Sequence, residues 1–123
     1  MYLYINCSIG YDLQLQLVDR RSVVGRRIKN GQRSEKFLNS LLDFLKTNQV
    51  RHKLSGLILV IDQGSYSQVR QAVALVNALA YAWAVPIIKL RKAPLTKADL
   101  FKVITGSPRL KMVKAVYSGL GVG

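Results

Sequence analysis

The sequence predicts an α/β domain built on a mixed β-sheet, and three observations carry this prediction. The apolar run Leu57–Ile61 has no polar break, as expected of a strand buried on both faces. A nearly all-apolar, alanine-rich helical stretch follows from about Gln68 to Ala84. The chain then passes Val85-Pro86 and enters another apolar run that ends at Leu90. A strand, a helix and a strand in this order form a crossover connection.

Three strands are expected before this crossover. Tyr2–Cys7 is apolar and rich in strand-forming residues, whereas Leu13–Val18 alternates apolar and polar residues like a half-exposed strand. Asp19–Arg21 supplies a turn into a third strand at about Ser22–Ile28. The first part of the chain is therefore predicted to be an antiparallel meander.

A helix is predicted from an N-cap at Ser34 to about Thr47. Leucine and phenylalanine recur there at helical spacing and are expected on the buried face. These residues are Phe37, Leu38, Leu41, Leu42, Phe44 and Leu45. Polar residues are expected on the outside, namely Lys36, Ser40, Asp43 and Lys46.

Local signals place the remaining connections. Asp62–Ser67 has turn chemistry and a hydroxyl to cap the long helix, and Arg91–Pro94 reads as a linker. Thr96 is the predicted cap of a short helix, Lys97–Ile104, and Gly106-Ser107-Pro108 breaks the chain after it.

The chain is strongly basic. Its 19 lysines and arginines against six acidic residues give a formal charge of +13, which favours association with polyanions such as nucleic acids. The alternative is a solvated surface that keeps a hydrophobic protein soluble. The densest basic cluster, and thus the predicted nucleic-acid-binding set, is Arg20, Arg21, Arg26, Arg27 and Lys29.

The sequence offers few residues for a catalytic or metal-binding site. Cys7 is the only cysteine and lies at a predicted strand, and His52 is the only histidine, in the polar loop Arg51–Lys53. One chain therefore offers neither a disulfide framework nor a metal cluster, and we expect no catalytic residue, no metal and no cofactor.

The same reasoning bears on location. A single cysteine fits a reducing cytoplasm, and the first six residues lack the pattern of a secretory signal. The only membrane candidate, Ala72–Ile88, is barely of spanning length and is interrupted by Asn77 and Pro86. We predict a cytoplasmic protein without a membrane span.

Two motifs resemble those of a known family. Gly64-Ser65-Tyr66-Ser67-Gln68-Val69-Arg70 resembles the Gly-Ser-Phe-Thr-Gly-Leu-Arg signature of the bacterial TsaB (YeaZ) proteins. The match continues through the alanine-rich helix to Val85-Pro86, where the family has Gly-Ile-Pro. Upstream, Arg33–Leu38 resembles the family's His-Ser-Glu-x-Leu-Leu helix start, with arginine in place of histidine. The tail Val113–Tyr117 resembles the family's Pro-x-Tyr segment near the C-terminus.

The resemblance selects one fold among several mixed-sheet plans. The order β-β-β-α-β-α-β is that of one lobe of the actin-like ATPase or ribonuclease H-like fold, here with an additional short C-terminal helix. At 123 residues the chain has room for one of the family's two lobes. We expect this lobe in residues 1–92, with residues 93–123 packing on the same domain as a helix and tail.

The family's chemistry transfers only in part. In ribonuclease H-like nucleases the first strand carries a metal-binding carboxylate, and Asn6 stands at that position here. Asp12 and Asp62 remain, but two scattered aspartates do not form a two-metal site. TsaB itself is regarded as a noncatalytic relative of the catalytic TsaD subunit, so the resemblance implies that this protein is not an enzyme.

What the resemblance implies instead is a scaffold for tRNA threonylcarbamoyladenosine modification. In TsaB-like proteins the two helices of the first lobe pack against a TsaD-like catalytic subunit, and the same surface forms a homodimer. The corresponding interface residues here are Ser34, Phe37, Leu38, Leu41, Tyr66, Arg70, Val73, Asn77 and Tyr81. Contact with tRNA would use the basic cluster. The alternative function is a stand-alone basic RNA- or DNA-binding module on a ribonuclease H-like scaffold.

Overall fold

A single five-stranded mixed sheet organises the protein. The computed structural model describes residues 1–20, 22–50, 54–61 and 66–113. The strands are β1 (Tyr2–Asn6), β2 (Leu13–Val18), β3 (Val23–Ile28), β4 (Gly56–Val60) and β5 (Ile87–Leu90). Their order across the sheet is β3-β2-β1-β4-β5. The first three strands are antiparallel neighbours, whereas β4 runs parallel to β1 and β5 parallel to β4. The predicted mixed sheet is confirmed.

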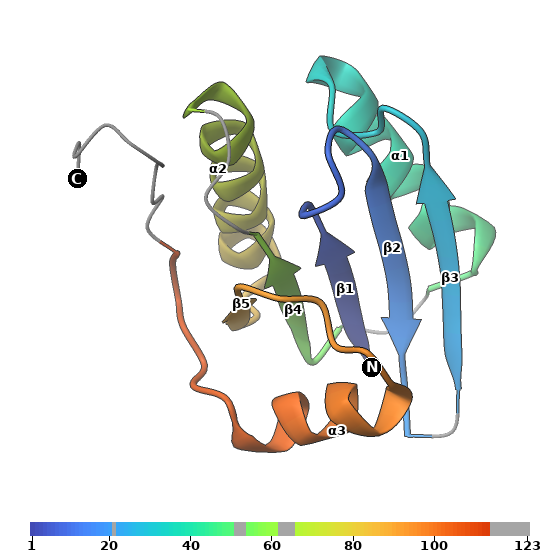
Figure 1. Cartoon of the computed structure of the whole chain (residues 1–123), viewed down its shortest axis with the longest axis vertical. Helices are drawn as coiled ribbons and strands as arrows, with labels where there is room; N and C mark the ends of the chain where they lie inside the picture. The colour runs from blue at the N-terminus through green and yellow to red at the C-terminus, as the bar shows by residue number, and fades with distance from the viewer. Residues whose placement is uncertain (21, 51–53, 62–65, 114–123) are drawn as a thin grey trace.

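Helices cover both faces of this sheet. The helices α1 (Ser34–Thr47) and α2 (Tyr66–Trp83) lie on one face, and α3 (Lys97–Gly106) crosses the other face (Figure 1). The connection from β4 through α2 to the neighbouring parallel strand β5 is the predicted crossover. The architecture is that of a three-layer α/β lobe.

The main core lies between the sheet and the helices α1 and α2. Alternate residues of β1 and β2, such as Leu3 and Leu15, point into it and meet Phe37 and Phe44 of α1. Every residue of β4 is buried, as its unbroken apolar sequence predicts. A smaller cluster on the opposite face holds Leu100 of α3 against the sheet.

Helix α1 begins at Ser34, but the predicted cap is wrong by one residue. Arg33 is the N-cap residue, with an extended backbone and no side-chain hydrogen bond, and its carbonyl accepts from the Lys36 amide at 3.0 Å. The segment before the helix is already fixed, because the Gln32 amide donates to the Tyr11 carbonyl at 3.0 Å. This backbone turn, not a hydroxyl cap, sets the start of the helix.

The apolar face of α1 is narrower than predicted. Phe37, Leu41 and Phe44 are fully buried, whereas Leu38 is 38% and Leu42 is 48% exposed. Each exposed leucine follows a buried residue by one position, which is a rotation of about 100° around the helix. The predicted burial of Leu38 and Leu42 is therefore wrong.

Helix α2 starts two residues earlier than predicted and ends one residue earlier. The predicted turn and its capping hydroxyl fall mostly on residues 62–65, outside the described residues. At the other end, Ala84 adopts a left-handed backbone conformation with a φ of 52°, and the Val85 amide donates to the Ala80 carbonyl at 3.0 Å. This is the geometry of a helix stop that glycine usually occupies.

Helix α3 confirms the predicted cap. The Thr96 hydroxyl accepts from the Asp99 amide at 3.1 Å, and the helix runs two residues beyond its predicted end. After it, Leu110 pairs with Ile87 at the outer edge of β5 through two backbone hydrogen bonds of 2.7 and 2.8 Å. The division of the chain at residue 92 stays a prediction.

The predicted membrane candidate divides into the second half of α2 and the start of β5. Within the described residues, no helix combines the length and the apolar character needed to cross a membrane.

Candidate functional site

The predicted interface residues occupy three different environments. Phe37, Leu41 and Val73 are buried core residues, so their side chains are not available to a partner. This corrects the prediction that they line an interface. They instead hold α1 and α2 against the sheet, because their apolar side chains are buried in the main core between these helices and the sheet. Ser34 and Tyr66 are the first residues of α1 and α2.

Leu38 and Leu42 form an apolar flank on α1. They lie four residues apart and therefore share one side of the helix. The opposite flank faces β3, because the Lys36 ammonium donates to the Lys29 carbonyl at 2.8 Å and Asp43 pairs with Arg26 at 3.0 Å. The two exposed leucines consequently lie on the side of α1 that faces α2.

Helix α2 presents small side chains to solvent. Ala74, Ala78 and Ala82 are exposed at four-residue spacing, and Tyr81, at 90% exposure, stands beside them. Arg70 is exposed one turn before Ala74. We call the exposed side chains of the two helices the outer helical face, and define it by Leu38, Leu42, Arg70, Ala74, Ala78, Tyr81 and Ala82. A ridge of alanines permits the backbone of a second helix to approach closely.

Asn77 does not belong to this face, contrary to the prediction. Its side-chain amide donates to the Val113 carbonyl at 2.9 Å, and its Oδ1 accepts from the Val113 amide at 2.8 Å. Both polar groups of the side chain are thus used to hold the segment that follows α3. Val113 is itself buried in the main core. Sequence reasoning missed this role because the bond spans 36 residues.

The predicted nucleic-acid-binding cluster is not one patch. Arg20 lies in the turn between β2 and β3, and Lys29 follows the far end of β3. The six-residue strand β3 is about 20 Å long, so it separates these two cations. Arg26 and Arg27 are neighbours on one strand, so they point to opposite faces of the sheet. Arg21 is outside the described residues.

Carboxylates already bind the two strand arginines. Arg26 pairs with Asp43 at 3.0 Å and lies 5.9 Å from the centre of the Phe44 ring, while Arg27 donates through Nε and an NH2 group to Asp12. The hydrogen bond from the Asn30 amide, followed by those from Arg27, holds the pKa of the Asp12 carboxyl below its usual value. Both pairs are partly exposed, so each contributes little to stability.

Asn6, at the position of a nuclease carboxylate, is a structural residue. It is buried, and its Nδ2 donates to Gln14 Oε1 at 3.0 Å. Its Oδ1 accepts from the amide and the hydroxyl of Ser8 at 3.0 and 2.6 Å. Its donor and acceptor therefore order the loop after β1 instead of facing a ligand.

Other candidates for chemistry are equally occupied or undescribed. Cys7 is buried, and burial raises the pKa of its thiol to about 12, so it stays protonated. His52 and Asp62 lie outside the described residues. Within the described ranges, no group of three or more histidine, cysteine, aspartate and glutamate side chains is arranged to hold a metal ion.

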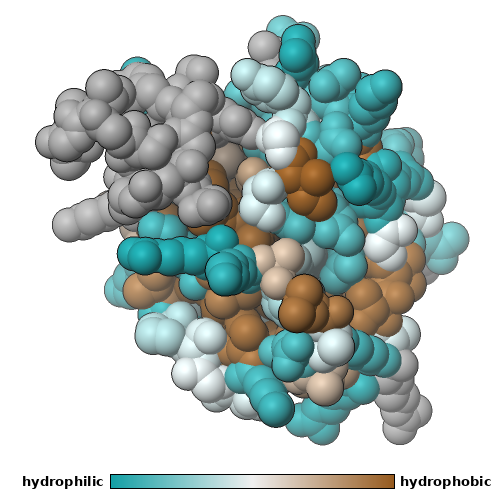
Figure 2. Space-filling view, viewed as in Figure 1, coloured by the Kyte–Doolittle hydropathy of each residue, from teal (hydrophilic) through white to brown (hydrophobic). Residues whose placement is uncertain are grey.

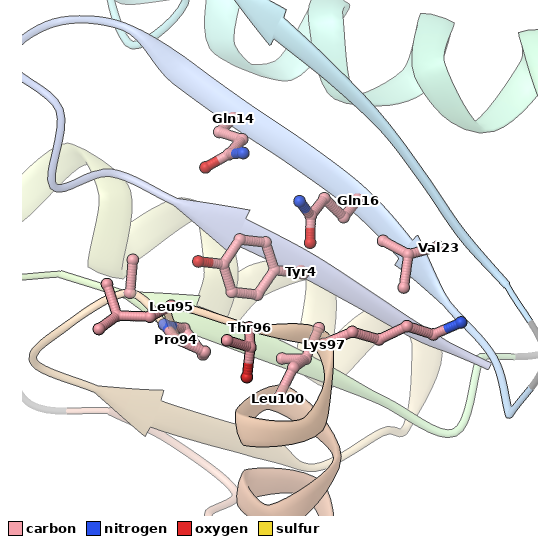
Figure 3. Close-up of a pocket in the computed structure, with 10 residues that line it drawn as sticks. Tyr4, Gln14, Gln16, Val23, Pro94, Leu95, Thr96, Lys97 and Leu100 are labelled. Atoms are coloured by element: carbon pink, nitrogen blue, oxygen red, sulfur yellow. The ribbon is translucent and has the colours of Figure 1, made fainter.

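A cleft that sequence reasoning missed lies on the opposite face of the sheet. It has a volume of about 240 Å³ and runs between the strands β1 and β2 and the segment that enters α3 (Figure 3). Its floor carries Tyr4, Gln14 and Gln16, and its wall carries Pro94, Leu95 and Leu100. The only sequence signal was a pair of glutamines at alternate positions of β2, which also fits a solvent-exposed strand face.

Comparison with known proteins identifies the fold. No protein-family model and no curated protein matches the chain. Solved structures do match it, and they include YeaZ from Pseudomonas aeruginosa, with a TM-score of 0.60 and 19% identity, and an uncharacterized protein with similarity to peptidase YeaZ from the same organism, with a TM-score of 0.62 and 18% identity. Each match covers 72% of this chain but 42% of the other, so the chain spans about two fifths of their length. The predicted TsaB-like fold, a single lobe of that kind, is confirmed.

Proposed function

We propose that this YeaZ-like lobe is a noncatalytic scaffold subunit that binds a TsaD-like catalytic subunit in tRNA threonylcarbamoyladenosine modification. The observation that carries the proposal is the outer helical face, where leucine and tyrosine side chains remain exposed on two helices whose buried sides are already complete. The TsaB-like motifs in the sequence support the choice of partner, since that family uses the same helix pair.

The chemistry of the face suits a protein partner. Leu38, Leu42 and Tyr81 are large apolar or amphipathic side chains exposed on adjacent helices. Aromatic residues are enriched in interface cores, and alanines permit close helix packing. A second copy of this chain, the other partner expected from the resemblance, would bind through the same side chains.

The noncatalytic part of the proposal rests on Asn6. This neutral amide stands where a nuclease needs a carboxylate, and it hydrogen-bonds to Gln14 and Ser8. A neutral amide is a weaker ligand for magnesium than a carboxylate.

Co-purification tests the proposal. The tagged chain is expressed together with the TsaD-like subunit of its host and recovered in about 1 M salt, where the screening length is roughly 3 Å and charge-driven contacts are weak. We expect a stoichiometric complex with the unaltered chain and with Leu95→Glu, but none with Leu42→Glu or Ala78→Glu.

Leu95→Glu is the matched control because Leu95 is 93% exposed on the opposite face of the sheet. Recovery of the complex with both helix variants would contradict the proposed interface. Failure of the unaltered chain to recover the subunit, with a stable homodimer in its place, would contradict the proposed partner.

The alternative, a stand-alone RNA- or DNA-binding module, is favoured by the charge of +13. It predicts binding to nucleic acid that weakens steeply with salt and does not depend on the outer helical face. Arg20 and Lys29 form no salt bridge within the described residues, so substituting both together separates the two functions. The scaffold proposal expects intact complex formation by this variant.

A further inference from the structure

The cleft on the α3 face is lined by a tyrosine hydroxyl that opens onto it. Tyr4 is 3% exposed and lines the cleft, yet within the described residues its hydroxyl makes no hydrogen bond. Among the described residues no buried side-chain oxygen or nitrogen lacks a partner, so this hydroxyl keeps access to solvent through the cleft, where it can donate a hydrogen bond to water or to a ligand. Burial raises the pKa of Tyr4 to about 12, and the hydroxyl therefore remains a donor at neutral pH.

The glutamines of β2 add directional groups to the same floor. Gln14 and Gln16 are two residues apart and project from one side of the strand, next to Tyr4 (Figure 3). Gln14 Oε1 is used by Asn6. The Gln16 amide has no hydrogen bond to any described residue, and it offers one acceptor and two donors in a plane.

The walls of the cleft are apolar and its rim is basic. Pro94, Leu95 and Leu100 face the glutamines across the opening. Lys97 extends along the rim toward Val23, and its ammonium lies 5.7 Å from the centre of the Phe101 ring (Figure 3). Arg91 and Lys92 are exposed on the segment that leads into the cleft. On this side of the molecule, apolar and hydrophilic residues alternate without a continuous apolar patch (Figure 2).

These features together select a class of ligand. The cleft volume of about 240 Å³ corresponds to roughly eight water molecules at about 30 Å³ each. This space is enough for one ring system but small for a larger ligand. A floor of neutral donors and acceptors suits the edge of a flat heterocycle, and apolar walls suit its faces. The lysine rim suits a phosphate attached to that heterocycle.

We infer that the cleft binds a nucleobase, either of a free nucleotide or of one unstacked base in single-stranded nucleic acid. The Tyr4 hydroxyl and the Gln16 amide would bind the base edge, and Lys97 would contact its phosphate. This site lies across the sheet from the outer helical face, so it is independent of the proposed scaffold function. It also differs from the predicted basic cluster, which contributes no residue to the cleft.

Binding measurements on the full chain test the inference. Isothermal titration calorimetry measures binding of each of the four nucleoside monophosphates. Fluorescence polarisation measures binding of labelled single-stranded RNA homopolymers. We expect one base to bind at least about fivefold more tightly than the others. Tyr4→Phe should weaken that binding about fivefold, the effect of one neutral hydrogen bond. Gln16→Leu should remove the preference among bases.

Three controls keep the result interpretable. Tyr11→Phe removes a hydroxyl from an exposed tyrosine outside the cleft and should leave binding unchanged. Lys97→Gln should reduce the salt dependence of RNA binding by about one phosphate contact, whereas Lys102→Gln, an exposed lysine of α3 outside the cleft, should not. Circular dichroism establishes that each variant is folded.

The outcomes distinguish a free nucleotide from a base of a nucleic-acid strand, and both of these from the absence of a base-binding site. Binding of a monophosphate with the stated variant effects identifies a free nucleotide as a ligand. The same effects with RNA alone identify an unstacked base of a strand. Equal binding of RNA by the unaltered chain, Tyr4→Phe and Gln16→Leu would overturn the inference, as would the absence of binding to every probe at physiological salt.

Discussion

The two faces of the sheet are covered very differently. Between the sheet and the helices α1 and α2, 21 buried residues of the described part of the chain form the main core, and leucines and a tyrosine of these helices stay exposed on the outside. On the other face, the smaller cluster has six buried residues among those described, of which Leu100 belongs to the short helix α3, and a cleft with polar side chains remains beside this helix. One face therefore has apolar side chains in excess of what folding needs, and the other has hydrogen-bonding groups that open onto a cleft and have no partner among the described residues.

This difference separates stability from recognition. A surface that is apolar on the outside of a complete core is suited to another protein, because association buries area that folding has left exposed. A cleft with an unpartnered hydroxyl and amide is suited to a small ligand, because a ligand can complete their hydrogen bonds.

The largest effect is expected in the main core. Phe44→Ala should lower the free energy of unfolding by about 3–5 kcal/mol, because Phe44 is fully buried and its removal leaves a cavity. Leu100→Ala should cost only about 2 kcal/mol, the low end for a buried leucine, since its cluster is small and borders the cleft. Urea unfolding measures both values. Equal losses would mean that the two faces contribute alike to stability.

A smaller effect is expected where the chain returns to α2. Asn77→Ala removes both hydrogen bonds to Val113 and should cost about 2 kcal/mol, at about 1 kcal/mol for each bond. Trypsin should also cut faster after Arg109 and Lys111. Asn39→Ala, on the exposed side of α1, is the control and should change neither measurement. Unchanged proteolysis of the Asn77 variant would show that this contact does not hold the segment.

The cap of α3 should have a still smaller effect. Thr96→Ala removes the acceptor for the Asp99 amide and should cost about 1 kcal/mol in thermal or urea unfolding. Thr96→Ser keeps the hydroxyl and should lie close to the unaltered chain. A Thr96→Ser variant as unstable as Thr96→Ala would indicate that the methyl group, not the cap, matters.

The smallest expected effect is a gain in the free energy of unfolding. Ala84→Gly relieves a left-handed backbone with φ of 52° at the end of α2, although the freer unfolded chain offsets part of the benefit. We expect about 0.5–1 kcal/mol more stability, seen as a higher urea midpoint. The TsaB family has Gly-Ile-Pro where this chain has Ala84-Val85-Pro86. A loss of stability would show that the alanine is not strained.

The sequence predicted the elements of the fold better than their surfaces. Apolar runs such as Leu57–Ile61 and the alternation of Leu13–Val18 identify strands because burial repeats along them with the period of the structure. The Thr96 cap was predictable because its partner, Asp99, is three residues away. Local patterns of this kind need no knowledge of the rest of the chain.

The errors concern contacts between distant residues. Leu38 and Leu42 match the helical pattern as well as Leu41 does, and only the position of α1 on the sheet decides which of them is buried. Asn77 reads as a surface residue until the chain returns at Val113. The cleft depends on Pro94–Lys97 folding back over Gln16, a relation that sequence spacing does not contain.

Covalent footprinting tests the central claim, an outer helical face that binds a protein partner, most directly. Hydroxyl radicals label exposed side chains, and mass spectrometry compares labelling of the free chain with that of its complex with the TsaD-like subunit. Tyr81 and Leu95 are both at least 90% exposed and lie on opposite sides of the sheet, so each serves as the reference for the other. If the outer helical face binds the partner, complex formation will protect Tyr81 and Leu42 and leave Leu95 labelled as before. Protection of Leu95 with unchanged labelling of Tyr81 and Leu42 would contradict it.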